Sequence, residues 1–217
     1  MPSLSFHGLE LLVIAHSARN RAVLDAKRPG ALTTDSIVAI VMAAASTEAF
    51  INELAEHIAL FRAAQMEGLT QSMVTCSDAL VELEDSKAPV TVKYLIASQI
   101  LGSPFARDAA PFQDFAMLIQ LRNAIMHAKP ATKESSHQGT KITDVLAQRG
   151  IATSLEPGVH FAWFNRLEVP DVARWACDAA RSIILGVIDL IPTRSEHDPL
   201  TWMGKSFRNH AGFEEPN

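Results

Sequence analysis

Apolar residues recur at intervals of three and four along most of this chain, and that helical period restricts its fold more than any other feature. The period is clearest in residues 33 to 65, which begin with the helix-start residues Thr33, Thr34 and Asp35. One apolar stripe runs along this segment and comprises Ile37, Ile40, Val41, Ala44, Ile51, Leu54, Ala55 and Ile58. The sequence therefore predicts a long helix that lies against a core.

The same period predicts further helices in the rest of the chain. Glycine and proline separate these segments, at Pro29, Gly68, Pro89, Gly102 and Pro130. The predicted helices cover residues 4 to 27, 69 to 85, 90 to 101, 111 to 128 and 169 to 191. We therefore expect an all-α fold, an up-and-down helical bundle of five to six helices.

The length of 217 residues suits one domain of ordinary size. We expect a single helical domain over residues 1 to 192. Within it, residues 129 to 168 predict a loop-rich insertion, because polar residues and glycine interrupt the helical period there. Its last part, GVHFAWFNRLEV, is compatible with a short strand or with an aromatic-rich turn. Residues 193 to 217 are rich in His, Pro, Gly and charge, and predict a loosely held C-terminal tail.

The composition, 48% apolar and 20% charged residues, is typical of a globular protein. A net charge of −5 argues against a protein that coats DNA or an anionic membrane.

Cys76 and Cys177 lack the spacing of a zinc site and fit buried thiols in a reducing cytosol. The longest apolar run, residues 37 to 45, is far shorter than the ~20 residues of a membrane helix. The N-terminus also lacks the basic and apolar blocks of a secretory signal. We expect a cytoplasmic protein with no metal, cofactor, DNA or membrane partner.

Two opposite charges interrupt apolar stripes. At ~100° per residue, Arg122 falls in the same sector of its helix as Phe115, Leu118, Ile119, Ile125 and Met126. Glu48 falls within the stripe of the long helix. Burying one unpaired charge costs several kcal/mol, so two such charges are most simply explained as partners. The sequence therefore predicts that Glu48 faces inward and contacts Arg122.

Asn123 and His127 follow Arg122 on the same helix, and we expect the three side chains to form one compact polar group. An arginine held by a carboxylate is rigid and always protonated, and its remaining donors can bind a phosphate. Histidine has a reference pKa of ~6.5, so His127 can exchange a proton near neutral pH. Asn123 can orient either neighbour by hydrogen bonding. The alternative interpretation is a structural Glu48–Arg122 pair beside an exposed histidine at a helix end.

The string LIQLRNAIMHAKP, together with AAASTEAFINELAEH on the long helix, resembles the HEPN superfamily of small all-α domains. The motif of that superfamily is an arginine followed, after four to six residues, by a histidine, commonly with a polar residue directly after the arginine. Arg122, Asn123 and His127 match this pattern position by position.

This resemblance implies a homodimer in which two motifs face each other across a cleft. Many members are metal-independent endoribonucleases in toxin, antiphage or RNA-processing systems. His127 would then move protons at the ribose 2′-OH or the leaving oxygen, and Arg122 would stabilise the phosphorane. RNA would be the substrate, with 2′,3′-cyclic phosphate and 5′-OH ends as products, and a protein antitoxin or regulator would be a further partner. One toxin subgroup carries a tyrosine, modified by its antitoxin, where this chain has Lys129, which argues against that class of partner.

Several other residues could carry chemistry, but for each of them the sequence favours a structural role. They are Glu53 with His57 as an exposed ion pair, Phe161, Trp163 and Phe164 as packing residues, and Arg208 with His210 in a solvated tail. Two alternatives to a nuclease stay open. One is a non-catalytic dimerisation or RNA-binding module, and the other is a bundle that binds a small molecule or nucleotide.

Overall fold

The computed structural model describes residues 6 to 27, 33 to 127, 138 to 154, 163 to 192, 199 to 210 and 213. These residues form α-helices and one 3₁₀ helix, with no strand among them, so the all-α prediction is confirmed. The elements are α1 (His7–Ala26), α2 (Asp35–Ala63), α3 (Gln71–Asp85), α4 (Val90–Ile100), α5 (Phe112–Met126), α6 (Gln138–Gln148), η1 (Trp163–Leu167), α7 (Pro170–Ile188) and α8 (Pro199–Asn209).

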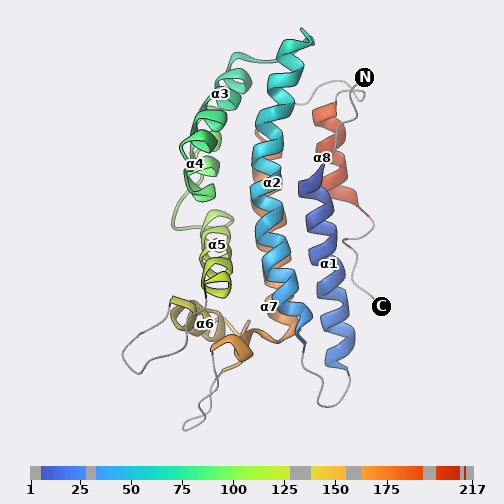
Figure 1. The fold of residues 1–217 in the computed structure, drawn as a ribbon, viewed down its shortest axis with the longest axis vertical. Coiled ribbons are helices and arrows are strands. Elements are labelled where there is room, and N and C mark those ends of the chain that lie inside the picture. The colour runs from blue at the N-terminus through green and yellow to red at the C-terminus, as the bar shows by residue number, and fades with distance from the viewer. Residues whose placement is uncertain are drawn as a thin grey trace.

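The long helix α2 is the centre of the bundle (Figure 1). Helices α1 and α7 run alongside it, while α3, α4 and α5 follow one another along its other side. Among the described helices, α2 alone is long and apolar enough to cross a membrane by length and composition. Its burial between the other helices accounts for that composition, because a central core helix is apolar on most of its surface.

Six of the observed helices, α1 to α5 and α7, lie close to the predicted segments. Two further helices were not predicted, so the described residues contain eight α-helices rather than five to six. Helix α6 lies within the segment expected to be loop-rich, and η1 occupies part of the stretch left undecided between strand and turn. Helix α8 lies within the expected loose tail, yet it buries Leu200, Met203 and Phe207. This part of the tail is therefore packed against the bundle.

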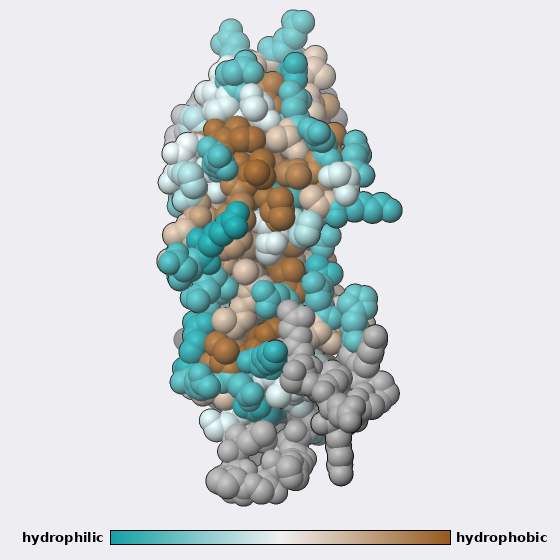
Figure 2. Space-filling model, turned by 90° about the vertical axis from the view of Figure 1, so that its left-hand side faces the viewer, coloured by the Kyte–Doolittle hydropathy of each residue, from teal (hydrophilic) through white to brown (hydrophobic). Residues whose placement is uncertain are grey.

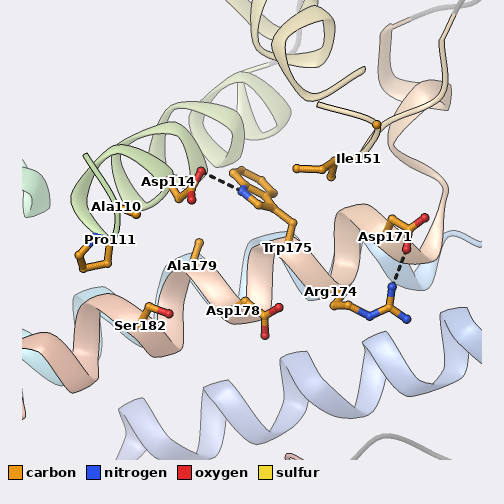
Figure 3. A pocket seen from close by; sticks show the side chains of 11 residues that line it. Ala110, Pro111, Asp114, Ile151, Asp171, Arg174, Trp175, Asp178, Ala179 and Ser182 are labelled. Atoms are coloured by element: carbon orange, nitrogen blue, oxygen red, sulfur yellow. Dashed lines mark hydrogen bonds and ion pairs between the residues drawn. The ribbon is translucent and has the colours of Figure 1, made fainter. Parts of the chain in front are cut away.

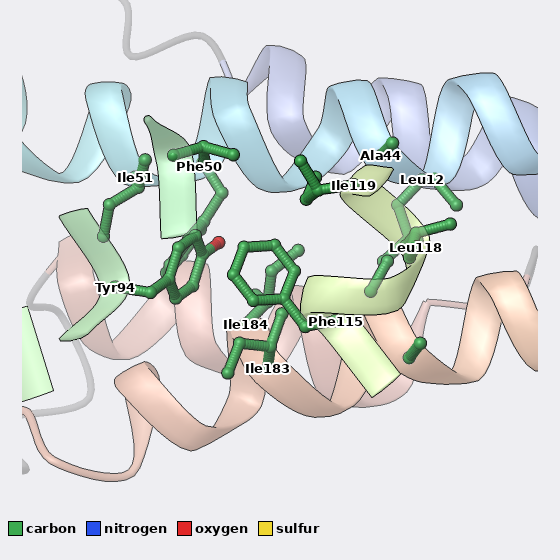
Figure 4. Close-up of a cluster of buried hydrophobic side chains, with 14 of the residues drawn as sticks. Leu12, Ala44, Phe50, Ile51, Tyr94, Phe115, Leu118, Ile119, Ile183 and Ile184 are labelled. Atoms are coloured by element: carbon green, nitrogen blue, oxygen red, sulfur yellow. The ribbon is translucent and has the colours of Figure 1, made fainter. Parts of the chain in front are cut away.

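Aromatic side chains hold α5 against α2 and α4 (Figure 4). The rings of Tyr94 and Phe115 lie 4.6 Å apart between their centroids, and both side chains are fully buried. The Tyr94 hydroxyl donates a hydrogen bond of 2.9 Å to the carbonyl oxygen of Thr47 on α2, so its polar atom is satisfied in the core. These contacts fix where α5, and every side chain on it, stands relative to α2.

The expected exposed ion pair of Glu53 and His57 is wrong. The Glu53 carboxylate instead accepts the first N–H groups of α1, from His7 at 2.6 Å and from Gly8 at 3.1 Å. A carboxylate at a helix N-terminus stabilises the otherwise unpaired N–H groups and the helix dipole. His57 is buried, with its ring edge-on to Phe6 at 5.1 Å. Both residues therefore help to attach α1 to α2.

Candidate functional site

Helix α5 carries the predicted motif, and apolar side chains on its inner face hold it in place. The buried residues of this helix are Phe112, Phe115, Leu118, Ile119 and Leu121. The helix ends at Met126, and His127 is its C-cap residue, whose backbone N–H donates to the carbonyl oxygen of Asn123 at 3.0 Å. The motif is thus built on a packed helix rather than on a loop.

The predicted contact between Glu48 and Arg122 is confirmed. Arg122 Nη2 lies 3.0 Å from Glu48 Oε2 and joins α5 to α2. The Arg122 side chain is 26% exposed, whereas that of Glu48 is 48% exposed. The prediction that Glu48 faces inward is therefore wrong: its neighbour Thr47 is buried, but Glu48 lies at the edge of the face that α5 covers. Water solvates this carboxylate in part, which weakens the ion pair relative to a buried one.

The rest of the Arg122 guanidinium is not used by Glu48. Its Nε is buried without a hydrogen-bond partner, and Nη1 makes no hydrogen bond to the residues that the structure describes. An arginine has five N–H donors in a planar fork, so one ion pair leaves most of them available. Arg122 is therefore anchored on one side and can still donate to an anion.

Lys93 is a charged residue of this region that the sequence analysis missed. Its side chain is only 3% exposed, and its Nζ donates to Asn52 Oδ1 at 2.8 Å and contacts the Glu84 carboxylate. Burial lowers the pKa of Lys93, and the nearby Glu48 carboxylate partly opposes that shift. Lys93 is the one charged residue in the apolar segment from 90 to 101, which is the same signal that identified Arg122.

Glu84, Lys93, Glu48 and Arg122 together form a charge network across α3, α4, α2 and α5. Two carboxylates balance two cations within it. The positive charge of Arg122 is consequently compensated inside the chain, and its attraction for a phosphate depends on the direction of its free donors.

The prediction of one compact polar group formed by Arg122, Asn123 and His127 is wrong. Asn123 and His127 are both exposed, and neither side chain has a partner in the described part of the chain, whereas Arg122 points to α2. The physical reason is helical geometry. Arg122 and His127 are five positions apart, and at ~100° per residue their directions differ by about 140°. Within one chain they therefore face different surroundings.

A groove of about 660 Å³ lies between α5 and α6, on the side of α5 that carries His127. Gln113 and Gln120 line it, and His127 follows at the same spacing of seven residues. Arg107 and Lys141 add two positive charges, and no carboxylate lines the groove among the described residues. This arrangement suits a segment of a polyanion beside the imidazole.

Apolar surface gathers over the other end of this side of the molecule, on α3 and α4 (Figure 2). Val81 on α3 is a large apolar residue that the structure leaves exposed. The half of the surface next to α5 and α6 is more polar (Figure 2). The motif thus lies at the more polar end of this side.

No metal centre is present among the described residues, which include no group of three or more His, Cys, Asp or Glu side chains placed to hold an ion. Cys76 and Cys177 are free and buried, as predicted. Burial raises the pKa of Cys76 to about 11 and that of Cys177 to about 12. Both thiols are therefore protonated and unreactive at neutral pH.

The remaining predicted residues have structural contacts or lie outside the described residues. Trp163 packs on Gly139, where an added Cβ would approach the indole to 2.7 Å. Arg208 and His210 are exposed, as expected, but Arg208 stands on the packed helix α8 and pairs with Asp189. Phe161 and Lys129 lie outside the described residues.

Comparisons of this chain with known protein families, with characterised proteins and with solved structures found no match.

Proposed function

We propose that this chain is a HEPN-like, metal-independent endoribonuclease that acts as a homodimer in the cytoplasm. Arg122 and His127 are its catalytic residues, and Asn123 supports them. The observation that carries the proposal is the anchored Arg122, which Glu48 holds through Nη2 while Nη1 stays available to a phosphate. The exposed His127 one and a half turns further along α5 supplies the proton-transfer group.

The chemistry is a transesterification within RNA. His127 accepts the proton of a ribose 2′-OH as its oxygen attacks the adjacent phosphorus, or donates a proton to the leaving 5′ oxygen. Arg122 donates hydrogen bonds to the non-bridging oxygens, whose negative charge grows in the phosphorane. The phosphorus–5′-oxygen bond breaks, which leaves a 2′,3′-cyclic phosphate and a 5′-OH.

Two chains are needed because Arg122 and His127 of one chain diverge by about 140°. A two-fold axis that brings two α5 helices together can place His127 of one chain near Arg122 of the other. The groove with Arg107 and Lys141 then guides the RNA backbone toward His127. This requirement for a composite site supports a dimer on geometric grounds.

Cleavage by single variants tests the enzymatic proposal. The purified chain, in excess EDTA, should cleave RNA to products with cyclic phosphate ends. Arg122→Ala and His127→Ala should each lower the rate at least about 100-fold. Arg62→Ala is the control. It removes an exposed arginine that, like Arg122, pairs with a carboxylate, here that of Asp78 on α3, and it should leave the cleavage rate unchanged. Equal cleavage by all three variants would contradict the proposal and point to a contaminating nuclease.

The Glu48–Arg122 pair also favours a second candidate, a non-catalytic dimerisation or RNA-binding module in which Arg122 is structural. Under this candidate, Arg122→Ala should lower the free energy of unfolding by about 1 kcal/mol, since the pair is only partly buried. His127→Ala should change nothing measurable, because the side chain is exposed without a partner in the described residues. RNA would be bound but not cleaved.

A further inference from the structure

A second pocket, of about 770 Å³, lies between the start of α5, the turn after α6 and α7 (Figure 3). None of the predicted site residues lines it. One wall comes from α7, whose lining residues at helical spacing are Asp171, Arg174, Trp175, Asp178, Ala179 and Ser182. Its volume lies within the roughly 300–1,000 Å³ of pockets that hold small molecules.

Asp114 and Trp175 are fixed together at one end of this pocket. Trp175 projects from α7 toward α5, and its Nε1 donates to Asp114 Oδ1 at 3.2 Å (Figure 3). Arg149 Nη1 donates to the same oxygen at 2.6 Å. The other oxygen, Oδ2, has no hydrogen-bond partner among the described residues. The structure therefore orients the carboxylate through one oxygen and leaves the second available as an acceptor.

Asp114 keeps its charge in this position. Burial by itself raises the pKa of Asp114, but the hydrogen bonds from Arg149 and Trp175 outweigh burial and hold the pKa below its usual value. At neutral pH the free oxygen thus belongs to an ionised carboxylate. A charged acceptor forms shorter and stronger hydrogen bonds than a neutral one, above all with a cationic donor.

The other charged side chains around the pocket also favour a positively charged ligand. Asp171 and Asp178 add two carboxylates, and the one lining cation, Arg174, already pairs with Asp171 at 2.5 Å. Arg149 in turn pairs with Asp114, so three carboxylates and two arginines surround this pocket. The indole of Trp175, which is largely buried, adds an apolar wall. An anion is disfavoured beside three carboxylates, whereas a cation can donate a charge-assisted hydrogen bond to the free Oδ2 of Asp114.

We propose that this pocket binds a small organic cation, with an amine or guanidinium group on a short apolar chain. The N–H groups of the cation donate to Asp114 Oδ2, and its apolar part lies along Trp175 and Ala179. This inference concerns a site separate from Arg122 and His127, and it does not depend on the nuclease proposal.

Agmatine, which carries a guanidinium and an amine on four methylenes, is a suitable probe for calorimetric titration of the whole chain. It should bind with one site per chain and a Kd of about 1 mM or lower. Asp114→Asn should weaken binding at least about ten-fold, because the charge of the acceptor is lost. Asp108→Asn is the matched control: it removes an exposed carboxylate outside the pocket lining, and should change Kd less than about two-fold.

Ala179→Leu tests the pocket without altering any charge, and should abolish binding because the larger side chain fills the wall. Circular dichroism shows whether each variant folds. If Asp114→Asn does not fold, the binding of agmatine to Ala179→Leu decides whether the pocket is the binding site. Three results would overturn the proposal. They are no binding of agmatine, equal binding of the neutral pentanamide or the anionic glutarate, and unchanged binding by the folded variants.

Discussion

His16 on α1 is a buried imidazole in the core. It is 1% exposed, and neither ring nitrogen has a hydrogen-bond partner in the described part of the chain. Its ring lies 4.6 Å from that of Phe213. Burial, with smaller contributions from the charges of Arg19 and Arg181, lowers the pKa of His16 to about 3. The folded chain therefore keeps this residue neutral over the physiological pH range.

This neutral histidine predicts acid destabilisation. The unfolded chain protonates His16 near pH 6.5, whereas the folded chain does so only near 3. The contribution of His16 to stability is thus complete above pH 6.5 and is lost as pH falls toward 3. Between pH 6.5 and 5 the free energy of unfolding should fall by about 1.6 kcal/mol through this residue, because the slope approaches about 1.4 kcal/mol per pH unit only below pH 6.5.

Urea unfolding at the two pH values measures this loss. His16→Leu should reduce the loss by that amount, while His127→Leu, which alters an exposed histidine, should leave it as in the parent chain. An equal loss in the His16 variant and the parent would show that His16 is not the residue responsible.

At the residue scale, part of the candidate site could be predicted from sequence. Glu48 and Arg122 were paired correctly because opposite charges that interrupt two apolar stripes have few other partners. Lys93 was missed, although it is the one charge in its apolar segment. Arg122 and His127 are close in sequence, which suggests that their side chains lie together. Their directions on the helix nevertheless differ by about 140°, so the predicted polar group does not form. The extent to which Glu48 is exposed depends on how α5 covers α2, and a pattern within one helix does not contain that information.

At the scale of the elements, the close packing of α1 on α2 depends on Gly8. A Cβ at this position would lie 2.9 Å from the backbone nitrogen of Phe50. A backbone atom within a long helix cannot move aside as a side chain can. The absence of a side chain at Gly8 is therefore a condition for the closeness of these two helices.

Gly8→Ala should lower the free energy of unfolding by about 1–3 kcal/mol, because the helices must separate. Gly204→Ala is the comparison variant: the atoms that its Cβ would meet, at 3.0 Å, belong to the side chains of Arg208 and Ile188. Gly204→Ala should therefore lower the free energy of unfolding less than Gly8→Ala does, and thermal unfolding of both variants measures the difference. A larger loss in Gly204→Ala than in Gly8→Ala would contradict this account of the α1–α2 contact.

The helices themselves were predictable to the extent that their apolar stripes were long. Helices α1 to α5 and α7 each bury a sustained stripe, and their predicted bounds lie within a few residues of the observed ones. Helices α6 and α8 have 11 residues each, as α4 does, but unlike α4 they expose wide polar faces, so a few apolar residues are their whole signal. In α8 these are Leu200, Met203 and Phe207, spaced three and four apart. The flanking residues are polar and include prolines, which predict a loop, so that spacing alone did not indicate a helix.

At the scale of the whole molecule, α8 completes the core rather than trailing from it. The ring of Phe207 lies 5.3 Å from that of Phe50 on α2, and both are buried. Phe207→Ala should lower the free energy of unfolding by about 3–5 kcal/mol, the cost of emptying a buried aromatic site. Truncation after Pro192 should lower it at least as much in urea unfolding. A truncated chain as stable as the parent would show that α8 does not contribute to the core.

The assembly of two chains is the central claim of the nuclease proposal, because Arg122 and His127 of one chain point about 140° apart on their helix. Complementation between two inactive variants tests it most directly. Under this proposal, Arg122→Ala and His127→Ala chains that are produced together would form mixed dimers in which one composite site retains both groups. The account predicts that each variant alone is inactive and that the mixture regains roughly a quarter of the parent RNA cleavage rate, since half the dimers are mixed and each has one intact site. A mixture as inactive as its components, or a chain that stays monomeric in solution while it cleaves RNA, would contradict it.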